Sequence, residues 1–317
     1  MAKVRNTIPW LILATLAALV MIGCDDQDSE IITPVFDTEE DYFRSVISND
    51  PFFASEEATL NDGAALPPDY NDSMGKINTE IFPLRFGRLI ESINRNVEFE
   101  RFDDTLVVAT VTMTITGQFL IAAAYSDTSA VPDTLIEKPF TSTALRKIKF
   151  FRIGRFREHH RNWVFKAISL VEGGTDSDEI QIKELKLEFP SGNSIVVTSP
   201  TDFFLYFDLP FFPIPIFRPD SEVRLRVTLT SDSPETDMVV LRYGAGRTGL
   251  RRHRIRLKLV SETQVGDSYE RVYELTWNIH FHLGKFNAHV DAVTHGTLFD
   301  DTAPVSTSFW GVPYIVQ

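Results

Sequence analysis

Strict alternation of apolar and polar side chains over residues 105–116 constrains the fold more than any other stretch of the sequence. One phase of this segment is entirely apolar and consists of Val107, Ala109, Val111, Met113 and Ile115, while the other phase is mostly threonine. Because successive side chains of a strand point to opposite faces of a sheet, the pattern predicts a long strand with one buried face. Gly117 follows directly and predicts a bulge or bend in that strand.

Similar alternation recurs along most of the chain and predicts an all-β fold. The runs lie at residues 146–153, 162–171, 179–189 and 194–199, and again at 223–229, 237–243, 252–260, 269–283 and 286–294. In the third run the apolar phase shifts between Ile182 and Leu185, which predicts a bulge. We expect two tandem β-sandwich domains, residues 81–200 and 221–317, similar in architecture to immunoglobulin-like and fibronectin-like domains. That resemblance implies no function by itself.

One short helix is expected ahead of the first domain, within the segment 24–80. Asp37 or Thr38 can cap its start, and three acidic residues follow in the first turn. Apolar residues at the spacing of a helical stripe come next, namely Phe43, Val46 and Ile47. The dipeptide Asp50-Pro51 is predicted to end the helix, and residues 55–80 are predicted to form a loop.

The first 23 residues have the pattern of a secretory signal peptide. Lys3 and Arg5 precede an almost wholly apolar run, residues 8–23, which is shorter than the ~20 residues that a membrane-spanning helix needs. The run leads into Val20-Met21-Ile22-Gly23-Cys24, which resembles the lipobox of bacterial lipoproteins, with Met21 in place of the commoner leucine. The resemblance implies that Cys24 carries a diacylglyceryl group, usually with a further acyl chain such as palmitate. An uncleaved anchor or an ordinary secretory signal is the alternative.

Such processing leaves an acidic chain whose single cysteine is the tether. Cys24 is the only cysteine, so disulfides and thiolate metal sites are excluded beyond it. Loss of Lys3 and Arg5 reduces the 31 basic residues to 29 against 44 acidic ones, a net charge of −15. That charge argues against nucleic acid as a partner. We expect the protein in the bacterial cell envelope, held to a membrane through the lipid on Cys24. The outer membrane is favoured, with the protein periplasmic or surface-exposed.

Residues 201–220, between the expected domains, are rich in phenylalanine and proline. Six phenylalanines and four prolines fall within the 19 residues from Thr201 to Pro219. Prolines at this spacing prevent ordinary pairing in the middle of a sheet. The segment is either a hydrophobic loop that touches a membrane or a partner, or a connector whose rings are buried between two sandwiches. We favour the connector, because large exposed apolar patches are rare on monomers.

The segment 146–161 is the strongest local departure from the acidic composition. It holds seven basic residues, Arg146, Lys147, Lys149, Arg152, Arg155, Arg157 and Arg161, with aromatic residues between them. A basic, aromatic face would suit an anionic glycan, phosphate head groups or an acidic partner. The alternative, which we favour, is a set of solvated strand faces whose charges pair with acids elsewhere in the chain.

A hairpin with Gly284-Lys285 as its two-residue turn is predicted near the end of the chain. This register opposes His280 to His289 and Asn278 to Asp291, and it brings four potential zinc ligands to one face: His280, His282, His289 and Asp291. The simpler interpretation, which we favour, is the polar outer face of a hairpin that binds no metal.

These features together favour a lipid-anchored binding or structural module over an enzyme. No nucleophile-elbow motif occurs and no cofactor is indicated. A glycan or a protein is the expected partner besides the membrane. Two other functions remain open: a surface-displayed hydrolase, for example a metal-dependent one, and an accessory subunit of an envelope export or assembly machine that docks through the aromatic segment.

Overall fold

The computed structural model describes residues 36–61, 81–126, 128–129, 131–157, 162–207, 213–244 and 253–317. The predicted signal peptide and Cys24 lie outside these ranges, so both the signal peptide and the lipidation stay predictions. Most described residues are in strands, and the helices are short: α2 (Glu39–Asn49), α3 (Pro51–Leu60) and α4 (His295–Phe299). None of the helices in these ranges is both long and apolar enough to span a membrane.

The predicted short helix is present as α2, and a second helix follows it without a loop. The Thr38 hydroxyl accepts a hydrogen bond from the Asp41 amide (3.1 Å), and the Asp41 carboxylate accepts one from the Thr38 amide (3.0 Å). These reciprocal bonds form a capping box. Asp50 then caps α3 by accepting from the Phe52 amide at 2.8 Å, and Pro51 takes the first helical position. The dipeptide expected to end one helix therefore also begins the next, which corrects the loop predicted from residue 55.

Eleven of the described strands form the larger sheet. Its main path runs β1-β2-β3-β5-β16-β15-β11-β12, and β4, β8 and β9 join it from the side. The bounds are β1 Phe82–Arg101, β2 Leu106–Ala124, β3 Thr134–Arg152, β4 Trp163–Ser169, β5 Val171–Thr175, β8 Phe204–Tyr206, β9 Ile216–Phe217, β11 Met238–Tyr243, β12 His253–Arg256, β15 Gly284–Val293 and β16 Thr307–Val316. Neighbouring strands are antiparallel except for the two-residue pair β9–β16.

Five strands form the smaller sheet, in the order β13-β14-β10-β6-β7. They are β6 Ile180–Glu188, β7 Ser194–Val197, β10 Glu222–Ser231, β13 Lys258–Val265 and β14 Ser268–Asn278. The register between β10 and β6 shifts where Thr228 faces Glu184 and Leu229 faces Ile182, which leaves Lys183 as an extra residue. The bulge predicted between Ile182 and Leu185 is thereby confirmed.

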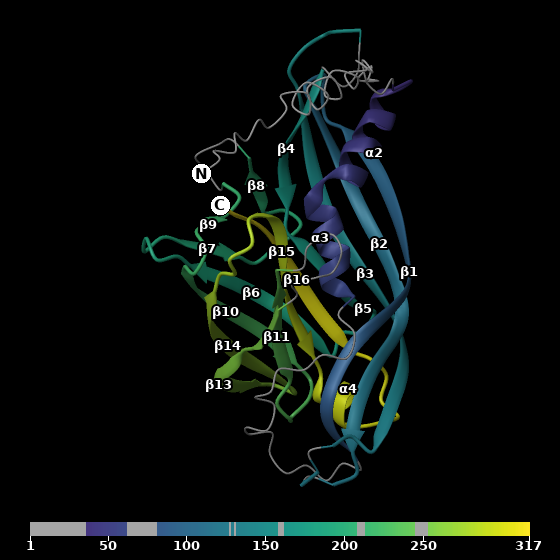
Figure 1. Ribbon diagram of the computed structural model, residues 1–317, viewed down its shortest axis with the longest axis vertical. Coiled ribbons are helices and arrows are strands. Elements are labelled where there is room, and N and C mark those ends of the chain that lie inside the picture. Colours follow the sequence, from purple (N-terminus) through teal and green to yellow (C-terminus); the bar gives the residue numbers. More distant parts are fainter. Residues whose placement is uncertain are drawn as a thin grey trace, which may run out of the picture. The chain divides into compact units, whose positions relative to one another are not determined.

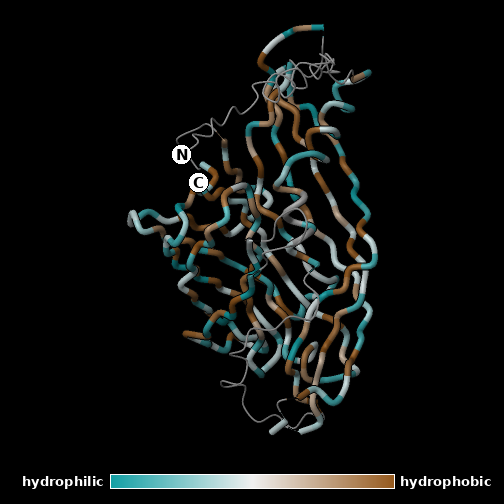
Figure 2. Tube along the Cα trace, in the orientation of Figure 1, coloured by the Kyte–Doolittle hydropathy of each residue, from teal (hydrophilic) through white to brown (hydrophobic). Residues whose placement is uncertain are grey.

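The predicted long strand is β2, and its two faces divide as expected. All five residues of the apolar phase are at most 2% exposed: Val107, Ala109, Val111, Met113 and Ile115. Figure 2 shows the same alternation of apolar and polar residues along the long strands. The predicted irregularity at Gly117 is also confirmed, because β1 slips by one residue between Ile90, which faces Gly117, and Ser92.

The larger sheet curls so that β1 approaches strands at the far end of its order. From β12, Arg254 donates to the carbonyl oxygen of Phe86 in β1 at 2.8 Å, and its guanidinium lies 4.2 Å from the centre of the Phe86 ring. Helices α2 and α3 lie against this sheet (Figure 1). α2 contacts β1 through Arg44, which donates to the Val97 carbonyl oxygen at 3.2 Å.

The strands are not divided between two sandwiches in tandem, which corrects the expected domain arrangement. Both sheets combine strands from before and after residues 201–220, and the whole of residues 36–317 forms one compact unit. The expected connector itself supplies β8 and β9 to the larger sheet, and Leu205, Ile214 and Phe217 are buried. Its residues 208–212 lie outside the described ranges. Alternation identifies the strands but not their partners, because pairing depends on long-range packing.

Gly117→Ala should destabilise the fold. A Cβ at this position would lie 2.1 Å from the carbonyl oxygen of Leu89, so β1 and β2 would have to separate, at a cost of about 1–3 kcal/mol. Chemical denaturation of residues 25–317 measures the effect. Gly296→Ala is the control, because its Cβ would meet Ala303 at an ordinary 3.7 Å. Equal stability of the two variants would contradict the assigned bulge geometry.

Candidate functional site

Six polar side chains meet inside the curled sheet, and we call them the interior cluster. They are Arg88 from β1, Arg146 from β3, Arg242 from β11, and Asn287, His289 and Asp291 from β15, and each is at most 2% exposed. The three residues of β15 alternate along the strand and therefore share one face. Burial of so many polar groups costs free energy unless they are paired. The stability of this cluster therefore depends on the contacts among its members.

Asp291 is the centre of the interior cluster. Its carboxylate accepts two hydrogen bonds from Arg88, at 3.0 and 2.7 Å, and lies 2.6 Å from Nη2 of Arg242. Burial raises the pKa of the Asp291 carboxyl, but the charges of Arg242 and Arg88 outweigh that effect and hold the pKa below its usual range. One ionised carboxylate thus joins β1, β15 and β11.

His289 is held neutral beside these charges. Its ring is fully buried, and burial together with the positive charges of Arg146 and Arg242 lowers the pKa of the imidazole to about 3. Among the described residues, neither ring nitrogen has a hydrogen-bond partner. Gly311 on β16 leaves room for the ring, since a Cβ there would lie 2.9 Å from Cε1 of His289. A histidine at this depth therefore requires a glycine on the neighbouring strand.

Helix α3 is fastened to the interior cluster. Arg146 donates to Oδ1 of Asn287 at 2.9 Å, and its guanidinium lies 5.6 Å from the centre of the Phe53 ring. Asn287 in turn donates from Nδ2 to the carbonyl oxygen of Phe52 at 2.5 Å. The cluster therefore links four strands and a helix. Its buried, paired side chains are typical of a structural network rather than of an open catalytic site.

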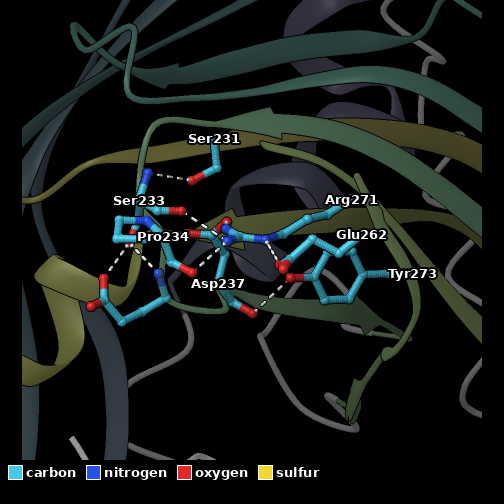
Figure 3. Close-up of polar contacts among 8 residues, drawn as sticks. Ser231, Ser233, Pro234, Asp237, Glu262, Arg271 and Tyr273 are labelled. Atoms are coloured by element: carbon cyan, nitrogen blue, oxygen red, sulfur yellow. Dashed lines mark hydrogen bonds and ion pairs between the residues drawn. The ribbon is translucent and has the colours of Figure 1, made fainter. Parts of the chain in front are cut away.

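A second buried network surrounds Arg271 on β14 (Figure 3). Its guanidinium lies 2.6 Å from Oδ2 of Asp237 and 2.6 Å from Oε2 of Glu262, and it donates to the carbonyl oxygens of Ser233 and Pro234 at 2.8 and 3.1 Å. The segment 232–237 carries the chain from β10 in the smaller sheet to β11 in the larger. Arg271 thus fixes this crossover, and through Glu262 it also fixes β13.

The basic residues of β3 do not share one face. Arg146 points into the interior, and the side chains on either side of it along the strand point the other way. On that other face Lys147 pairs with Asp202 at 2.8 Å, and Nζ of Lys149 lies 3.7 Å from the centre of the Phe204 ring. Alternation along a strand is the reason that a run of cations in sequence separates in space.

The remaining basic residues lie at the end of β3 and in the segment that follows it. Arg152 lies over the Trp163 ring at 5.7 Å, whereas Arg155 and Arg157 are exposed. Arg161 is outside the described residues. Anion binding by the exposed basic residues of this segment stays a prediction. Arg146 is excluded from that surface, because its side chain is buried inside the sheet.

The predicted histidine hairpin is not formed, which corrects the register proposed for residues 273–291. β14 ends at Asn278 in the smaller sheet, and β15 begins at Gly284 in the larger one, so the chain crosses between sheets where a turn was expected. His289 instead faces Arg242 of β11 and Gly311 of β16. His289 and Asp291 therefore belong to the interior cluster and do not join His280 and His282.

His280 and His282 contact other groups near the crossing. Nε2 of His280 lies 2.8 Å from the Tyr314 hydroxyl, and its Nδ1 accepts from the His282 amide at 3.2 Å. Burial, with smaller effects from His253 and His282, lowers the pKa of His280 to about 4. Across the described residues, no group of three or more histidine, cysteine or acidic side chains is arranged to hold a metal ion.

The arginines that organise both networks were not predicted from the sequence. Arg88, Arg242 and Arg271 each occupy a strand position whose side chain is buried, although arginine is seldom buried unless it is paired. The sequence held one signal for such a residue, namely a charged side chain in the apolar phase of an alternating run. Arg271, for example, lies two residues before Tyr273 and therefore on the same buried face of the strand.

Asp291→Asn should destabilise the protein strongly. The substitution leaves Arg88 and Arg242 buried without their carboxylate, which typically costs about 3–5 kcal/mol. Urea denaturation of residues 25–317 measures the change. Asp202→Asn is the matched control, because that carboxylate is exposed and its pair with Lys147 is worth at most about 1 kcal/mol. Similar losses of unfolding free energy in both variants would show that Asp291 does not stabilise the interior cluster more than a surface carboxylate would.

Stability should fall in mild acid because of His289. The pKa of its imidazole is about 3 in the folded protein and ~6.5 in an unfolded chain, so below pH ~6.5 the unfolded chain binds the extra proton. The contribution of neutral His289 is complete above that pH and is lost as the pH falls toward 3, with a slope of up to ~1.4 kcal/mol per pH unit.

The comparison is between the wild type and His289→Gln, with unfolding free energies measured from pH 4.5 to 7. Carboxylates titrate in both proteins, so the difference in slope isolates the histidine. The variant should show the shallower dependence. Parallel curves would mean that the pKa of His289 is the same in the folded protein as in the unfolded chain.

Two comparisons with known proteins found no match for this chain. No protein-family model matches it, and no curated protein is significantly similar to it. Its function is therefore inferred from its own residues and their geometry.

Proposed function

We propose that this chain is a lipid-anchored protein of the bacterial cell envelope that acts as a binding module. The anchor is the lipid on Cys24, favoured at the outer membrane, and the binding surface is the open edge of the smaller sheet. The exposure of β13 is the observation that supports this edge as the binding surface.

All eight residues of β13 are exposed, on both faces of the strand. Among the described strands it pairs only with β14, so it forms one edge of its sheet. Leu259, Val260 and Val265 are 38, 50 and 61% exposed. Exposed edges that carry apolar side chains are sites where another chain can pair.

Strand addition is the recognition chemistry that such an edge supports. An extended segment of a partner would pair with the backbone of β13, and its alternate side chains would contact Leu259, Val260 and Val265. The network of Arg271 holds β13 in place from beneath, because Glu262 of β13 lies 2.6 Å from that guanidinium. The edge is therefore positioned before a partner arrives.

The other functions have less support. The interior cluster and the Arg271 network are buried ion-pair networks rather than open pockets, so neither of them supports a hydrolase. A docking role for the aromatic segment 201–220 gains little, because Leu205, Ile214 and Phe217 of that segment are packed inside. A glycan would need exposed aromatic rings to stack on, and β13 carries no aromatic side chain.

Val260→Lys should abolish strand addition, because a charge in the middle of an edge strand is a known protection against pairing. Full-length protein is extracted in mild detergent, and the size of its complexes is compared by native electrophoresis. We expect the variant to lose the larger species. Val196→Lys is the matched control, since Val196 is 45% exposed on β7, the opposite edge of the same sheet.

Two results would contradict the proposal. One is a wild-type protein that runs as a monomer in extracts of its own membrane. The other is loss of the larger species in both lysine variants, which would point to a general effect of charge. Equal thermal unfolding of the two variants is expected, because both side chains are exposed.

A further inference from the structure

Three large apolar side chains are exposed together at one end of the long strands, and we call them the tip surface. Phe102, Ile153 and Phe156 are 59, 61 and 51% exposed. Phe102 lies in the turn from β1 to β2, and the other two follow β3. The two segments are neighbours, because the Arg152 amide donates to the carbonyl oxygen of Thr105 at 2.8 Å.

Polar contacts fix the backbone that presents these side chains. The Ile153 amide donates to the carbonyl oxygen of Asn162 at 2.7 Å. The Asn162 side chain is bonded to both the amide and the carbonyl of Phe156, with Nδ2 donating to that carbonyl at 2.9 Å. In the neighbouring turn, Asp103 accepts from the amides of Thr105 and Leu106 at 2.6 and 2.9 Å. The tip surface is thus built on ordered turns.

The N-terminal segment joins the described structure at this same end. Phe36, the first described residue, lies 5.4 Å from the Tyr42 ring, and the Tyr42 hydroxyl donates to the Trp163 carbonyl oxygen at 3.1 Å. Glu39 at the start of α2 pairs with Arg101 at 2.5 Å, and Arg101 precedes Phe102. Figure 1 shows the start of α2 beside this end of the long strands.

The length of chain before Phe36 limits how far the tip surface can be from the anchored lipid. Cys24 precedes Phe36 by 12 residues, 36 minus 24. A fully extended segment of that length spans at most ~40 Å. A lipid on Cys24 therefore keeps Phe36, and with it this end of the described structure, within ~40 Å of the bilayer. The three exposed apolar side chains at this end thus have an apolar medium within reach.

Charge alone does not draw the tip surface to a membrane. The two segments that form the tip surface carry two exposed arginines, Arg155 and Arg157, and two exposed aspartates, Asp103 and Asp104, so the signs largely offset each other. Apolar contact is the dominant attraction, because removing apolar area from water stabilises association by ~25 cal/mol per Å².

We propose that the tip surface rests in the interfacial region of the bilayer that anchors Cys24, with Phe102, Ile153 and Phe156 in contact with lipid. This inference rests on the proposed lipid anchor. It adds a second membrane contact and fixes how the folded part stands on the membrane.

The test uses the lipidated full-length protein carrying one added cysteine. Because lipidation occupies Cys24, the only native cysteine, Ile153→Cys provides a single site for an environment-sensitive fluorophore. The labelled protein is reconstituted in phosphatidylcholine vesicles with or without a nitroxide-labelled lipid. Val265→Cys is the matched control, since Val265 on β13 is also 61% exposed.

We expect a blue shift and at least twofold quenching by the nitroxide lipid at position 153, and neither at position 265. Equal signals at both positions would overturn the proposal, while co-flotation of the protein with the vesicles would show that the anchor itself stands. Failure to co-float would instead refute the anchor, and the inference with it.

Two further outcomes would also overturn the proposal. Quenching that appears only when phosphatidylglycerol is added would assign the contact to Arg155 and Arg157 rather than to the apolar side chains. A blue shift that depends on protein density but not on the nitroxide lipid would mean that a second copy of the chain covers the tip surface.

Discussion

The curled form of the larger sheet depends on one carboxylate. Asp291 on β15 receives Arg88 from β1 and Arg242 from β11 within a region closed to water. β1 and β15 are separated by four strands in the sheet order, so this ion pair is a contact across the curl rather than along it. Breaking a buried pair on one side leaves a charge without compensation, which gives the interaction its large structural weight.

Two further sets of contacts connect the rest of the structure. The same strand that carries Asp291 also carries Asn287, which holds helix α3 through the Phe52 carbonyl oxygen. On the other side, the crossover from β10 to β11 is fixed by Arg271, whose partner Glu262 belongs to β13. In Figure 1 the start of α2 lies near the top of the picture, and β13 lies at the lower left, away from it. Under our proposals, the end that receives the tether rests on the bilayer and the open edge projects away from it.

Local features of this fold could be predicted from the sequence, and long-range ones could not. The alternation of β2, the bulges near Gly117 and Lys183 and the start of α2 follow from side-chain period and capping chemistry. The pairing of strands does not, since β14 and β15 have the pattern of a hairpin yet belong to different sheets. The same error placed His280 opposite His289, whereas the structure pairs His289 with Arg242 and Gly311. The interior cluster was invisible because its arginines come from β1, β3 and β11, and only the closed sheet brings them to Asp291.

The role of Asp291 in holding the curl is tested most directly by hydrogen exchange on the Asp291→Asn variant under native conditions. Local opening has its own free energy in each part of a protein, and exchange followed by mass spectrometry resolves those parts. If Asp291 holds the curl, β1 and β12 should lose amide protection first, while β6, β10 and β14 of the smaller sheet keep theirs. Unchanged protection of β1, or an equal loss in both sheets, would contradict the account.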